Sequence, residues 1–408
     1  MKKADIVIVG GGVIGAAIAS SLAREIKDVL LIEKEGIAAQ ASGSNYGIVD
    51  CPRAPGFEYK AVSRSLELYD DLVENHFDLD IEYEKVGGLI VGFTPAQSKV
   101  LKWYCKSIND IGVDMEFVDG REVAELEPNL NPDIIAGAYC ENDVQVNPYK
   151  TVMAFANLAR RRGAAIQCGT EVTKINLTAG KVYSVDTTAG TIETSAVIVA
   201  NSYMSRQLMQ TIGIDIPIFP QRLQSLVTAP QERLLTRIVQ GARCISDEEA
   251  EDNPEYAVDY DYPLEWPAES GLPTVDVEKT VYAFLKPTTS GSIVLGTTCE
   301  FVGTDRRTTP QALSAIAKET LKICPALANA NIIRTWSGLI PYTFDGKPIL
   351  GKIPDIGGLY IAAGHPHAMS HAPAVGEIFA ELIMKEYGMS EFAKSIFDET
   401  SIQRHASS

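Results

Sequence analysis

The fold is decided by one stretch near the N-terminus, which contains DIVIV (5–9), GGGVIG (10–15), AAIASSLAR (16–24) and VLLIE (29–33). The compact β-branched runs are typical of buried parallel strands, and the small residues between them predict a helix. The glycines follow the spacing G-x-G-x-x-G. Gly10 permits a tight turn, Gly12 lets a pyrophosphate approach the backbone, and Gly15 lets the helix lie close to the sheet.

Two further features of this stretch indicate a dinucleotide site. The free N–H groups at the start of the helix would face the phosphate charge. Glu33 ends the second strand, where a carboxylate can accept a hydrogen bond from a ribose hydroxyl and so favours an unphosphorylated ribose. The order of these features predicts a nucleotide-binding βαβ unit, and a glycine-rich turn in another βαβ fold is the alternative. The motif does not separate NAD from FAD.

Composition and charge narrow the class of protein. The 408 residues suffice for two or three domains, and 46% hydrophobic with 22% charged residues is typical of a globular chain. A net charge of −17 repels phosphate backbones and anionic lipid, so we expect neither nucleic-acid nor membrane-surface binding. No run reaches the roughly 18–20 apolar residues of a membrane span. The seven cysteines include no C-x-x-C pair, which disfavours disulfides and an internal iron–sulfur centre and favours a cytoplasmic location.

The rest of the chain predicts an α/β fold with a second, inserted part. Periodicity and turn residues predict helices over 61–75, 96–111, 148–163 and 374–385, and strands over 87–93, 196–200 and 359–363. Residues 38–47 look like a flexible loop that could wrap a cofactor. Short runs at 165–168, 171–177, 181–187 and 191–193 predict a β-meander, and 282–285 with 292–296 predict a hairpin.

One segment is strongly acidic. Residues 244–278 contain twelve Asp or Glu and no Lys or Arg. Four aromatic residues in the segment argue against plain disorder. A solvated surface excursion is the simple interpretation, and a lid or a docking surface for a partner protein is the alternative.

Several separated motifs together resemble the D-amino-acid oxidase, glycine oxidase and sarcosine oxidase family of FAD-dependent flavoproteins. They are DIVIVGGGVIG with IEK, ASGSNYG (41–47), REVAELEPNL (121–130), DVQVNPYK (143–150), WSGLIPYTFDGKPILG (336–351) and LYIAAGH (359–365) with GEIFAELI (376–383). The resemblance covers nearly the whole chain and is specific to the family, not to a substrate.

The resemblance implies a Rossmann-like, glutathione-reductase-like FAD-binding domain built from residues 1–50, 143–215 and 335–408. An α+β substrate domain on a large mixed sheet would come from residues 51–142 and 216–334, with the acidic excursion at 244–278. Besides the glycines, the positions that match FAD contacts in the family are Val13, Ile14, Glu33, Lys34, Ala41, Ser42, Tyr46, Gly47, Ile48, Val172, Gly364, His365, Pro366, His367, Ala368, Met369 and Ser370. The loop 364–370 is expected to lie over the flavin, where the dipole of the following helix would stabilise reduced flavin.

The sequence departs from the family pattern where an amino-acid substrate would bind. Ile340 stands where relatives often carry the arginine that clamps the substrate carboxylate. Arg222, Arg334 and His367 are candidate substitutes. Tyr342 would either line the active site or pack under Trp336. We expect no metal site, although histidines stand at 365, 367 and 371.

Three functions follow from the resemblance. The first is oxidation of the C–N bond of an amino acid or an N-substituted amino acid, by hydride transfer to flavin N5 and hydrolysis of the imine. The second is the FAD subunit of a hetero-oligomeric amino-acid or opine dehydrogenase that passes electrons to a partner subunit, which would supply any further electron carrier. The third is a flavin-binding structural subunit with altered catalysis.

Overall fold

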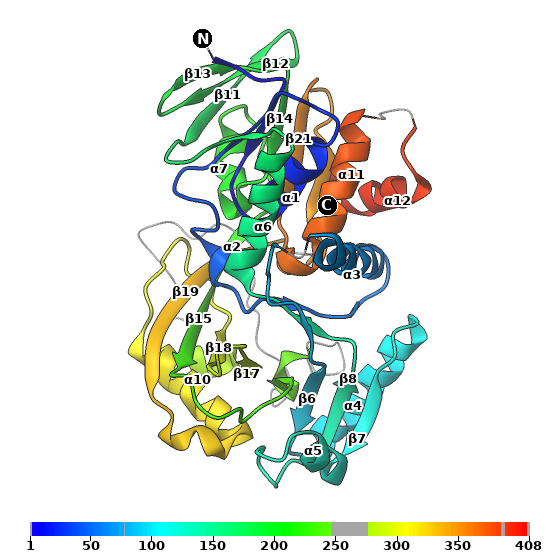
Figure 1. The fold of residues 1–408 in the computed structure, drawn as a ribbon, viewed down its shortest axis with the longest axis vertical. Coiled ribbons are helices and arrows are strands. Elements are labelled where there is room, and N and C mark those ends of the chain that lie inside the picture. The colour runs from blue at the N-terminus through cyan, green and yellow to red at the C-terminus, as the bar shows by residue number, and fades with distance from the viewer. Residues whose placement is uncertain (1, 77, 246–275, 344, 385–387, 406–408) are drawn as a thin grey trace.

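The computed structural model describes residues 2–76, 78–245, 276–343, 345–384 and 388–405. Two large sheets organise the chain (Figure 1). A six-stranded sheet and its helices form the upper half in this view, and an eight-stranded sheet with its own helices forms the lower half. This is the mixed α/β fold with a large mixed sheet that the sequence predicts. Most of the predicted acidic excursion, residues 246–275, lies outside the described residues.

The six-stranded sheet has the order β10-β3-β2-β14-β21-β20. Its five strands from β10 to β21 are parallel, and β20 is antiparallel to β21. The strands are β10 (Ala165–Gln167), β3 (Val29–Ile32), β2 (Ile6–Val9), β14 (Ala196–Val199), β21 (Leu359–Ala363) and β20 (Ile349–Lys352). In β2, Ile6 and Ile8 join one buried cluster and Val7 and Val9 another, so both faces of the strand are covered, as a continuous apolar run requires.

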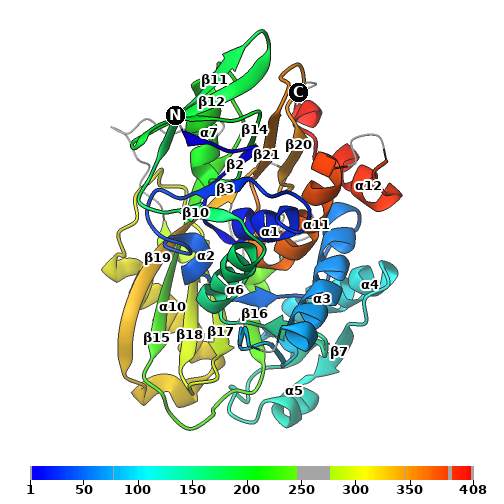
Figure 2. The same ribbon diagram turned by 45° about the horizontal axis from the view of Figure 1, so that its top comes forward.

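Three helices pack on one face of this sheet, with α1 between the other two (Figure 2). They are α1 (Val13–Leu22), α6 (Pro148–Arg161) and α11 (Ala368–Met384). Small residues allow this close contact: a Cβ on Gly376 would lie 2.8 Å from the carbonyl oxygen of Ala17. Outside α11 lie α3 (Phe57–Asn75) and α12 (Glu391–Thr400).

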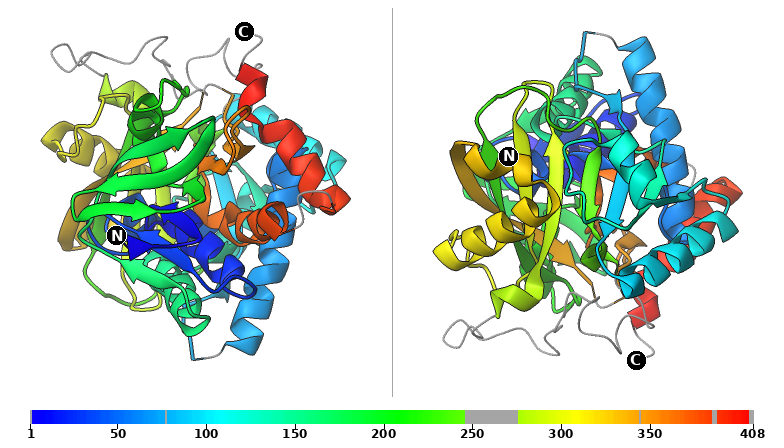
Figure 3. Two further views of the ribbon diagram at one scale, coloured as in Figure 1. Left: turned by 90° about the horizontal axis from the view of Figure 1, so that it is seen from above. Right: turned by 90° about the horizontal axis from the view of Figure 1, so that it is seen from below.

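A four-stranded sheet covers the other face (Figure 3, left). Its order is β1-β13-β12-β11, with bounds β1 (Lys2–Lys3), β13 (Gly190–Glu193), β12 (Lys181–Thr187) and β11 (Val172–Thr178), and α7 (Ser205–Gln210) packs beside it. The prediction that residues 165–168 open this meander is wrong. β10 instead pairs in parallel with β3, because α6 returns the chain to that edge of the central sheet.

The eight-stranded sheet is mixed, since β16 and β6 are parallel and the other neighbours antiparallel. In order its strands are β19 (Ile332–Tyr342), β15 (Phe219–Thr228), β18 (Ile293–Thr298), β17 (Val281–Pro287), β16 (Ile238–Gly241), β6 (Gly88–Gly92), β8 (Ala136–Cys140) and β7 (Glu116–Asp119). Its outer face is covered by α10 (Pro310–Ile323), α4 (Pro95–Asp110) and α5 (Gly120–Leu126), as seen from below (Figure 3, right).

Short elements connect these parts. A three-stranded sheet has the order β4-β9-β5. The remaining elements are β4 (Ile48–Val49), β9 (Val144–Gln145), β5 (Glu84–Lys85), α2 (Ala41–Ser44), α9 (Val277–Thr280), η1 (Ser202–Met204), η2 (Ala242–Cys244), η3 (Pro325–Asn329) and η4 (Ile402–His405). The residues 38–47 that were expected to form only a loop therefore contain one helical turn, α2.

The last large helix begins earlier than its sequence predicts. The expected start was residue 374, whereas α11 begins at Ala368 and contains Pro373. Proline has no N–H, so the carbonyl of Met369 loses its partner within the helix. The hydroxyl of Tyr69 on α3 donates to that carbonyl at 2.9 Å and replaces the lost bond.

The predicted boundaries between two domains stay a prediction. The side chains of α3 lie in the core of the upper half, since Phe57, Ala61 and Tyr69 pack in the same cluster as α1 and α11. Among the helices of the described residues, none combines the length and the hydropathy that crossing a membrane requires.

Candidate active site

A cavity of about 320 Å³ runs from the glycine turn after β2 to the inner side of the eight-stranded sheet. Nearly all the residues predicted to contact a dinucleotide line it, although they come from distant segments. These are Gly10, Gly12, Val13, Ile14, Glu33, Lys34, Ala41, Ser42, Tyr46, Gly47, Ile48, Val172 and all seven residues from Gly364 to Ser370. The exception is Gly15. Their roles in binding stay predictions, but the structure does place them together.

The three predicted glycines have distinct surroundings. Gly10 has φ +115°, and a Cβ there would lie 2.5 Å from the carbonyl oxygen of Ala200, so this turn needs glycine. A Cβ on Gly15 would lie 2.0 Å from the carbonyl oxygen of Gly10, which explains how this residue lets α1 approach the sheet without lining the cavity. Gly12 faces the cavity and the Ser42 hydroxyl, 2.9 Å from the position of a Cβ.

The start of α1 suits an anion. No side chain caps the helix through Gly12, and its first turn holds no acidic residue. The Val13 N–H donates to the Ser42 hydroxyl at 3.1 Å. Glu33 accepts from the N–H groups of Gly11 at 2.6 Å and Glu35 at 2.8 Å, so its carboxylate lies at the edge of the glycine turn. These features fit the phosphates and ribose of a dinucleotide.

The other end of the cavity carries a chain of histidines and a carboxylate. His365 Nδ1 lies 3.4 Å from His371 Nδ1, and His371 Nε2 lies 2.7 Å from a carboxylate oxygen of Glu58. Burial and the neighbouring His371 lower the pKa of His365 well below its usual value, so His365 is neutral. Its buried Nε2 has no hydrogen-bond partner among the described residues, and the ring lines the cavity. This orphaned nitrogen fits a polar atom of a bound cofactor.

His367 lies beside the same carboxylate. Its Nδ1 is 4.0 Å from a Glu58 oxygen, and its side chain is 64% exposed into the cavity region. Desolvation by the surrounding cavity walls would lower the pKa of His367, but the carboxylates of Glu58 and Asp50 outweigh it and raise that pKa. Burial would raise the pKa of Glu58, but His371 and His367 more than offset this effect and lower that pKa. Glu58 is therefore a carboxylate that holds two imidazoles at one end of the cavity.

Sequence reasoning missed Asp50 and Glu58. Asp50 follows β4 and lines the cavity. Burial, followed by the charge of Asp143, raises the pKa of Asp50 to about 6, while Arg53 and His367 partly offset the increase. The sequence did contain a signal for Asp50, because it is a carboxylate between apolar residues directly after the predicted cofactor loop. Glu58 gave none, because only the packing of α3 brings it to the histidines.

Aromatic rings form the wall on the eight-stranded sheet. Tyr46, Tyr282, Phe284 and Tyr342 all line the cavity. The rings of Tyr46 and Phe284 lie 4.3 Å apart, and the Tyr46 hydroxyl is 2.9 Å from that of Ser225. Tyr342, the predicted active-site tyrosine, meets the ring of Phe301 edge-on at 6.2 Å. Burial, only partly offset by the hydroxyl partners, raises the pKa of Tyr46, so it stays neutral.

The two predicted arginine clamps lie elsewhere. Neither Arg222 nor Arg334 lines the cavity. Arg222 is buried and donates to Glu300 at 2.6 Å and to Asp305 at 3.0 Å, so its charge is already paired. Arg334 lies in an exposed part of β19 with its guanidinium 5.4 Å from the ring of Trp336. Their positions do not support the role in substrate binding. Ile340 lines the cavity at the position where the family resemblance predicts an arginine.

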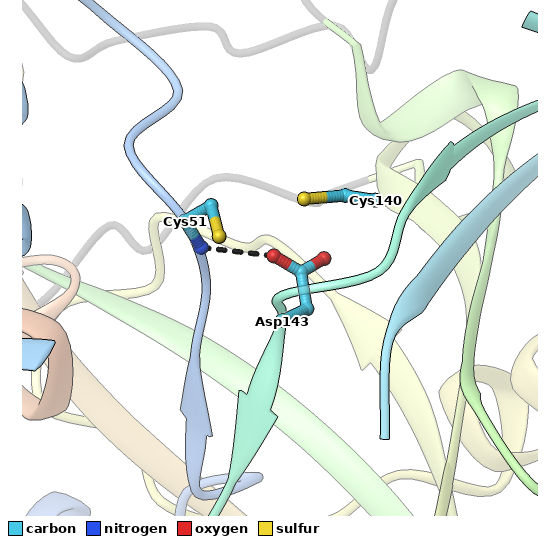
Figure 4. Close-up of side chains that lie close together, drawn as sticks. All are labelled: Cys51, Cys140 and Asp143. Atoms are coloured by element: carbon cyan, nitrogen blue, oxygen red, sulfur yellow. Dashed lines mark hydrogen bonds between the residues drawn. The ribbon is translucent and has the colours of Figure 1, made fainter. Parts of the chain in front are cut away.

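Cys51, which follows Asp50 in the chain, belongs to a buried cluster with Cys140 and Asp143 (Figure 4). The potential ligand atoms of the three residues lie within 4.8 Å of one another. Both oxygens of Asp143 are engaged, one by the Cys51 N–H at 2.8 Å and one by the guanidinium of Arg53. Hydrogen bonding to Cys140, together with burial, raises the pKa of Cys51. A cation would have to displace Arg53, so we interpret the cluster as an anchor for the backbone next to Asp50 and assign no metal.

A parallel sheet with a glycine turn, opening into an aromatic-lined chamber, defines a dinucleotide-dependent enzyme. Residues 5–382 match the family model DAO, described as FAD dependent oxidoreductase. The chain is 26% identical to glycine oxidase of Bacillus subtilis (strain 168) over 392 residues, or 94% of this chain and 93% of that one. It is 26% identical to sarcosine oxidase subunit beta of Arthrobacter sp over 374 residues, which is 89% of this chain and 82% of that one.

A solved structure of a similar protein supports the same family. L-proline dehydrogenase from P. horikoshii superposes with a TM-score of 0.80 at 26% identity, with 100% of this chain and 98% of that chain covered. The chain belongs to the DAO family of FAD-dependent oxidoreductases, and FAD rather than NAD is its cofactor. It is an oxidoreductase of the kind that acts on amino acids and amines.

Proposed function

We propose that this enzyme oxidises the C–N bond of an amino acid, of an N-substituted amino acid or of a related amine, and releases the imine for hydrolysis. The observation that carries the proposal is one continuous cavity. It joins a dinucleotide turn at Gly10–Gly12 to a chamber that holds Asp50, His365 and four aromatic rings. The similarity to glycine oxidase and L-proline dehydrogenase supports the same reaction class.

Bound FAD would supply the acceptor for a hydride from the carbon that bears nitrogen. The chain's own groups prepare that step. We assign the dinucleotide to the residues from Gly10 to Ile14, with Glu33 and Ser42, and the ring system to the segment from Gly364 to Ser370. There the N-terminus of α11 would stabilise negative charge. The aromatic wall excludes water from the substrate.

The reaction needs a neutral amine, so a proton must leave the substrate ammonium. Asp50 is suited to accept it at a carboxylate oxygen, because it lines the cavity and is mostly ionised at neutral pH. His367, paired with Glu58, is a neighbour of Asp50 in the same chamber. We therefore place proton transfer on Asp50 and leave Tyr342 as a wall residue.

The test is an anaerobic visible spectrum of the FAD-loaded protein before and after addition of pooled D-, L- and N-methyl amino acids, opines and simple amines. Bleaching of the oxidised flavin band by a member of the pool is the expected result. Flavin that binds but stays oxidised with every member would instead support the structural-subunit alternative.

A second candidate is the FAD subunit of a hetero-oligomeric dehydrogenase. Two observations favour it: the similarity to a sarcosine oxidase subunit, and the exposed Ile332 and Ile333 (46% and 62%) on the edge strand β19. Within the described part of the chain, the close cysteines are Cys51 and Cys140, fewer than the four ligands of an iron–sulfur cluster, so a partner would carry that centre. Rapid reoxidation of the reduced flavin by oxygen alone would argue against this candidate.

We also propose a cytoplasmic location. All seven cysteines are free in the structure, and five of them are buried. This pattern is common in reducing compartments.

A further inference from the structure

The charge of the substrate chamber is unusual for an enzyme that would clamp a carboxylate. Among the described residues that line the cavity, Lys34 is the only Lys or Arg. Its Nζ lies 2.9 Å from the Met204 sulfur and 3.8 Å from Glu35, just after the end of β3, in the segment that carries Glu33. Within the described parts of the chain, the chamber beside the aromatic wall therefore offers no guanidinium or ammonium group to a substrate carboxylate.

A carboxylate occupies that chamber instead. Asp50 lines the cavity, and the acidic groups that face it are Asp143 and Glu58. Its cationic neighbours are Arg53 and His367. Arg53 lies 3.9 Å from Asp50 but is bonded more closely to Asp143 and does not line the cavity. His367 is paired with Glu58.

Because Arg53 is bonded to Asp143 and His367 is paired with Glu58, the carboxylate of Asp50 is the charged group of this chamber that can contact a ligand. The same cavity is lined by Tyr46, Tyr282, Phe284 and Tyr342, and aromatic ring faces attract cations. The Asp50 Oδ1 lies 3.9 Å from Arg53 and has no hydrogen-bond partner among the described residues. A chamber with this carboxylate, several aromatic rings and an aliphatic side chain at Ile340 complements an organic cation. It opposes an anion, because a desolvated carboxylate would face Asp50 without a counter-ion.

We infer that the substrate is an amine that enters as an organic cation and carries no carboxylate on the carbon that bears the nitrogen, with Asp50 as its counter-ion. This inference rests on the proposed function and narrows it from amino acids and amines to amines. Asp50 then both binds the ammonium and accepts its proton.

Two planar probes of nearly equal shape and opposite charge test the inference on the FAD-loaded full chain. Benzamidine is a cation and benzoate an anion at neutral pH, and each is titrated while the visible flavin spectrum is followed. We expect benzamidine to bind at least about tenfold more tightly than benzoate. The preference should decline as the pH falls through about 6, where Asp50 takes up a proton.

Variants assign the preference to Asp50. Asp50→Asn should reduce the ratio of the two dissociation constants at least about fivefold, Asp50→Glu should retain most of it, and Asp110→Asn, an exposed carboxylate on α4, should leave it unchanged. Flavin content and the unfolding midpoint show that each variant is folded. Tighter binding of benzoate, a response to neither probe, or an unchanged ratio in folded Asp50→Asn would overturn the inference.

Substrate pairs separate this inference from the broader proposal. Pyrrolidine and proline, or benzylamine and phenylglycine, differ by one carboxylate. Faster flavin reduction by the amine of each pair is expected. Faster reduction by the amino acid would refute the inference and leave the proposed function standing, whereas flavin that no amine or amino acid reduces would refute the proposed function itself.

Discussion

Gly12 occupies a position where a side chain has no room. A Cβ there would press on the Ser42 hydroxyl, which holds the Val13 N–H at the start of α1. We predict that Gly12→Val weakens FAD binding at least about tenfold, since both the phosphate cradle and this bond are disturbed. Gly36→Ala is the matched control, because nothing lies within 4 Å of a Cβ there. Equal FAD retention by the two variants, measured by flavin fluorescence after gel filtration, would contradict the assignment of this turn.

Glu58 gives a pH-dependent contribution to stability. Its own pKa is lowered and that of His367 is raised, so the pair is charged between these two values. The free-energy difference between the wild type and Glu58→Gln should therefore be largest near pH 5–6, between the unperturbed pKa values of about 4.3 and 6.5. It should shrink as the pH rises through the raised pKa of His367, and again as the pH falls through the lowered pKa of Glu58.

The part of this difference that varies with the ionisation of His367 is modest because His367 is exposed, so we expect that part to be no more than about 1 kcal/mol. Denaturant unfolding of the FAD-free protein at several pH values measures it. A difference that grows steadily above pH 7 would show that another group carries the effect.

At the scale of elements, α3 supports the beginning of α11. Tyr69 is fully buried and donates to the Met369 carbonyl that Pro373 leaves without a partner. We predict that Tyr69→Phe lowers the free energy of unfolding by about 1–2 kcal/mol and weakens FAD binding, because the turn that contains residues 368–370 loosens. Tyr59→Phe on the same helix is the control, since Tyr59 is 37% exposed. An unfolding midpoint equal to that of the control would show that α3 does not support the first turn of α11.

The two arginines that the sequence offered as clamps predict different outcomes. Arg222→Met would leave the buried Glu300 without its counter-ion, while Asp305 would keep its ion pair with Arg307, and the change should cost about 3 kcal/mol of unfolding free energy. Arg334→Met, on the exposed part of β19, should change it by less than about 0.5 kcal/mol. Neither should raise the KM of the folded enzyme. A large increase in KM with unchanged stability in Arg222→Met would instead support the hypothesis that Arg222 binds the substrate carboxylate.

The sequence predicts an element well when the pattern that determines it lies within the element itself. β2, α1 and β3 lie close to their predicted positions because each has its own pattern within a few residues. β10 was assigned to the wrong sheet because pairing partners are set by the path of α6. The start of α11 was missed because its compensation comes from Tyr69, 300 residues away from Met369.

At the scale of the whole molecule, the cavity exists only when both sheets are in place. Family motifs predicted the residues of the dinucleotide end, since each lies within a short motif of its own, and the structure brings them together. The chamber could not be predicted in the same way. Asp50, Glu58 and the aromatic wall acquire a role through the docking of α3 and of the eight-stranded sheet, and Arg222 loses one through its burial with Glu300.

The central claim is that this molecule breaks a C–H bond next to nitrogen with FAD. A single anaerobic turnover of the FAD-loaded protein with its best reducing amine tests it most directly, with the carbonyl product, the released nitrogen compound and the reduced flavin all quantified. We predict one carbonyl group for each flavin reduced, together with one released amine or ammonia when the substrate is acyclic, whereas a cyclic amine gives a single product that carries both the carbonyl and the amine. Reduced flavin with no carbonyl product, or reduction by alcohols but by no amine, would contradict the claim.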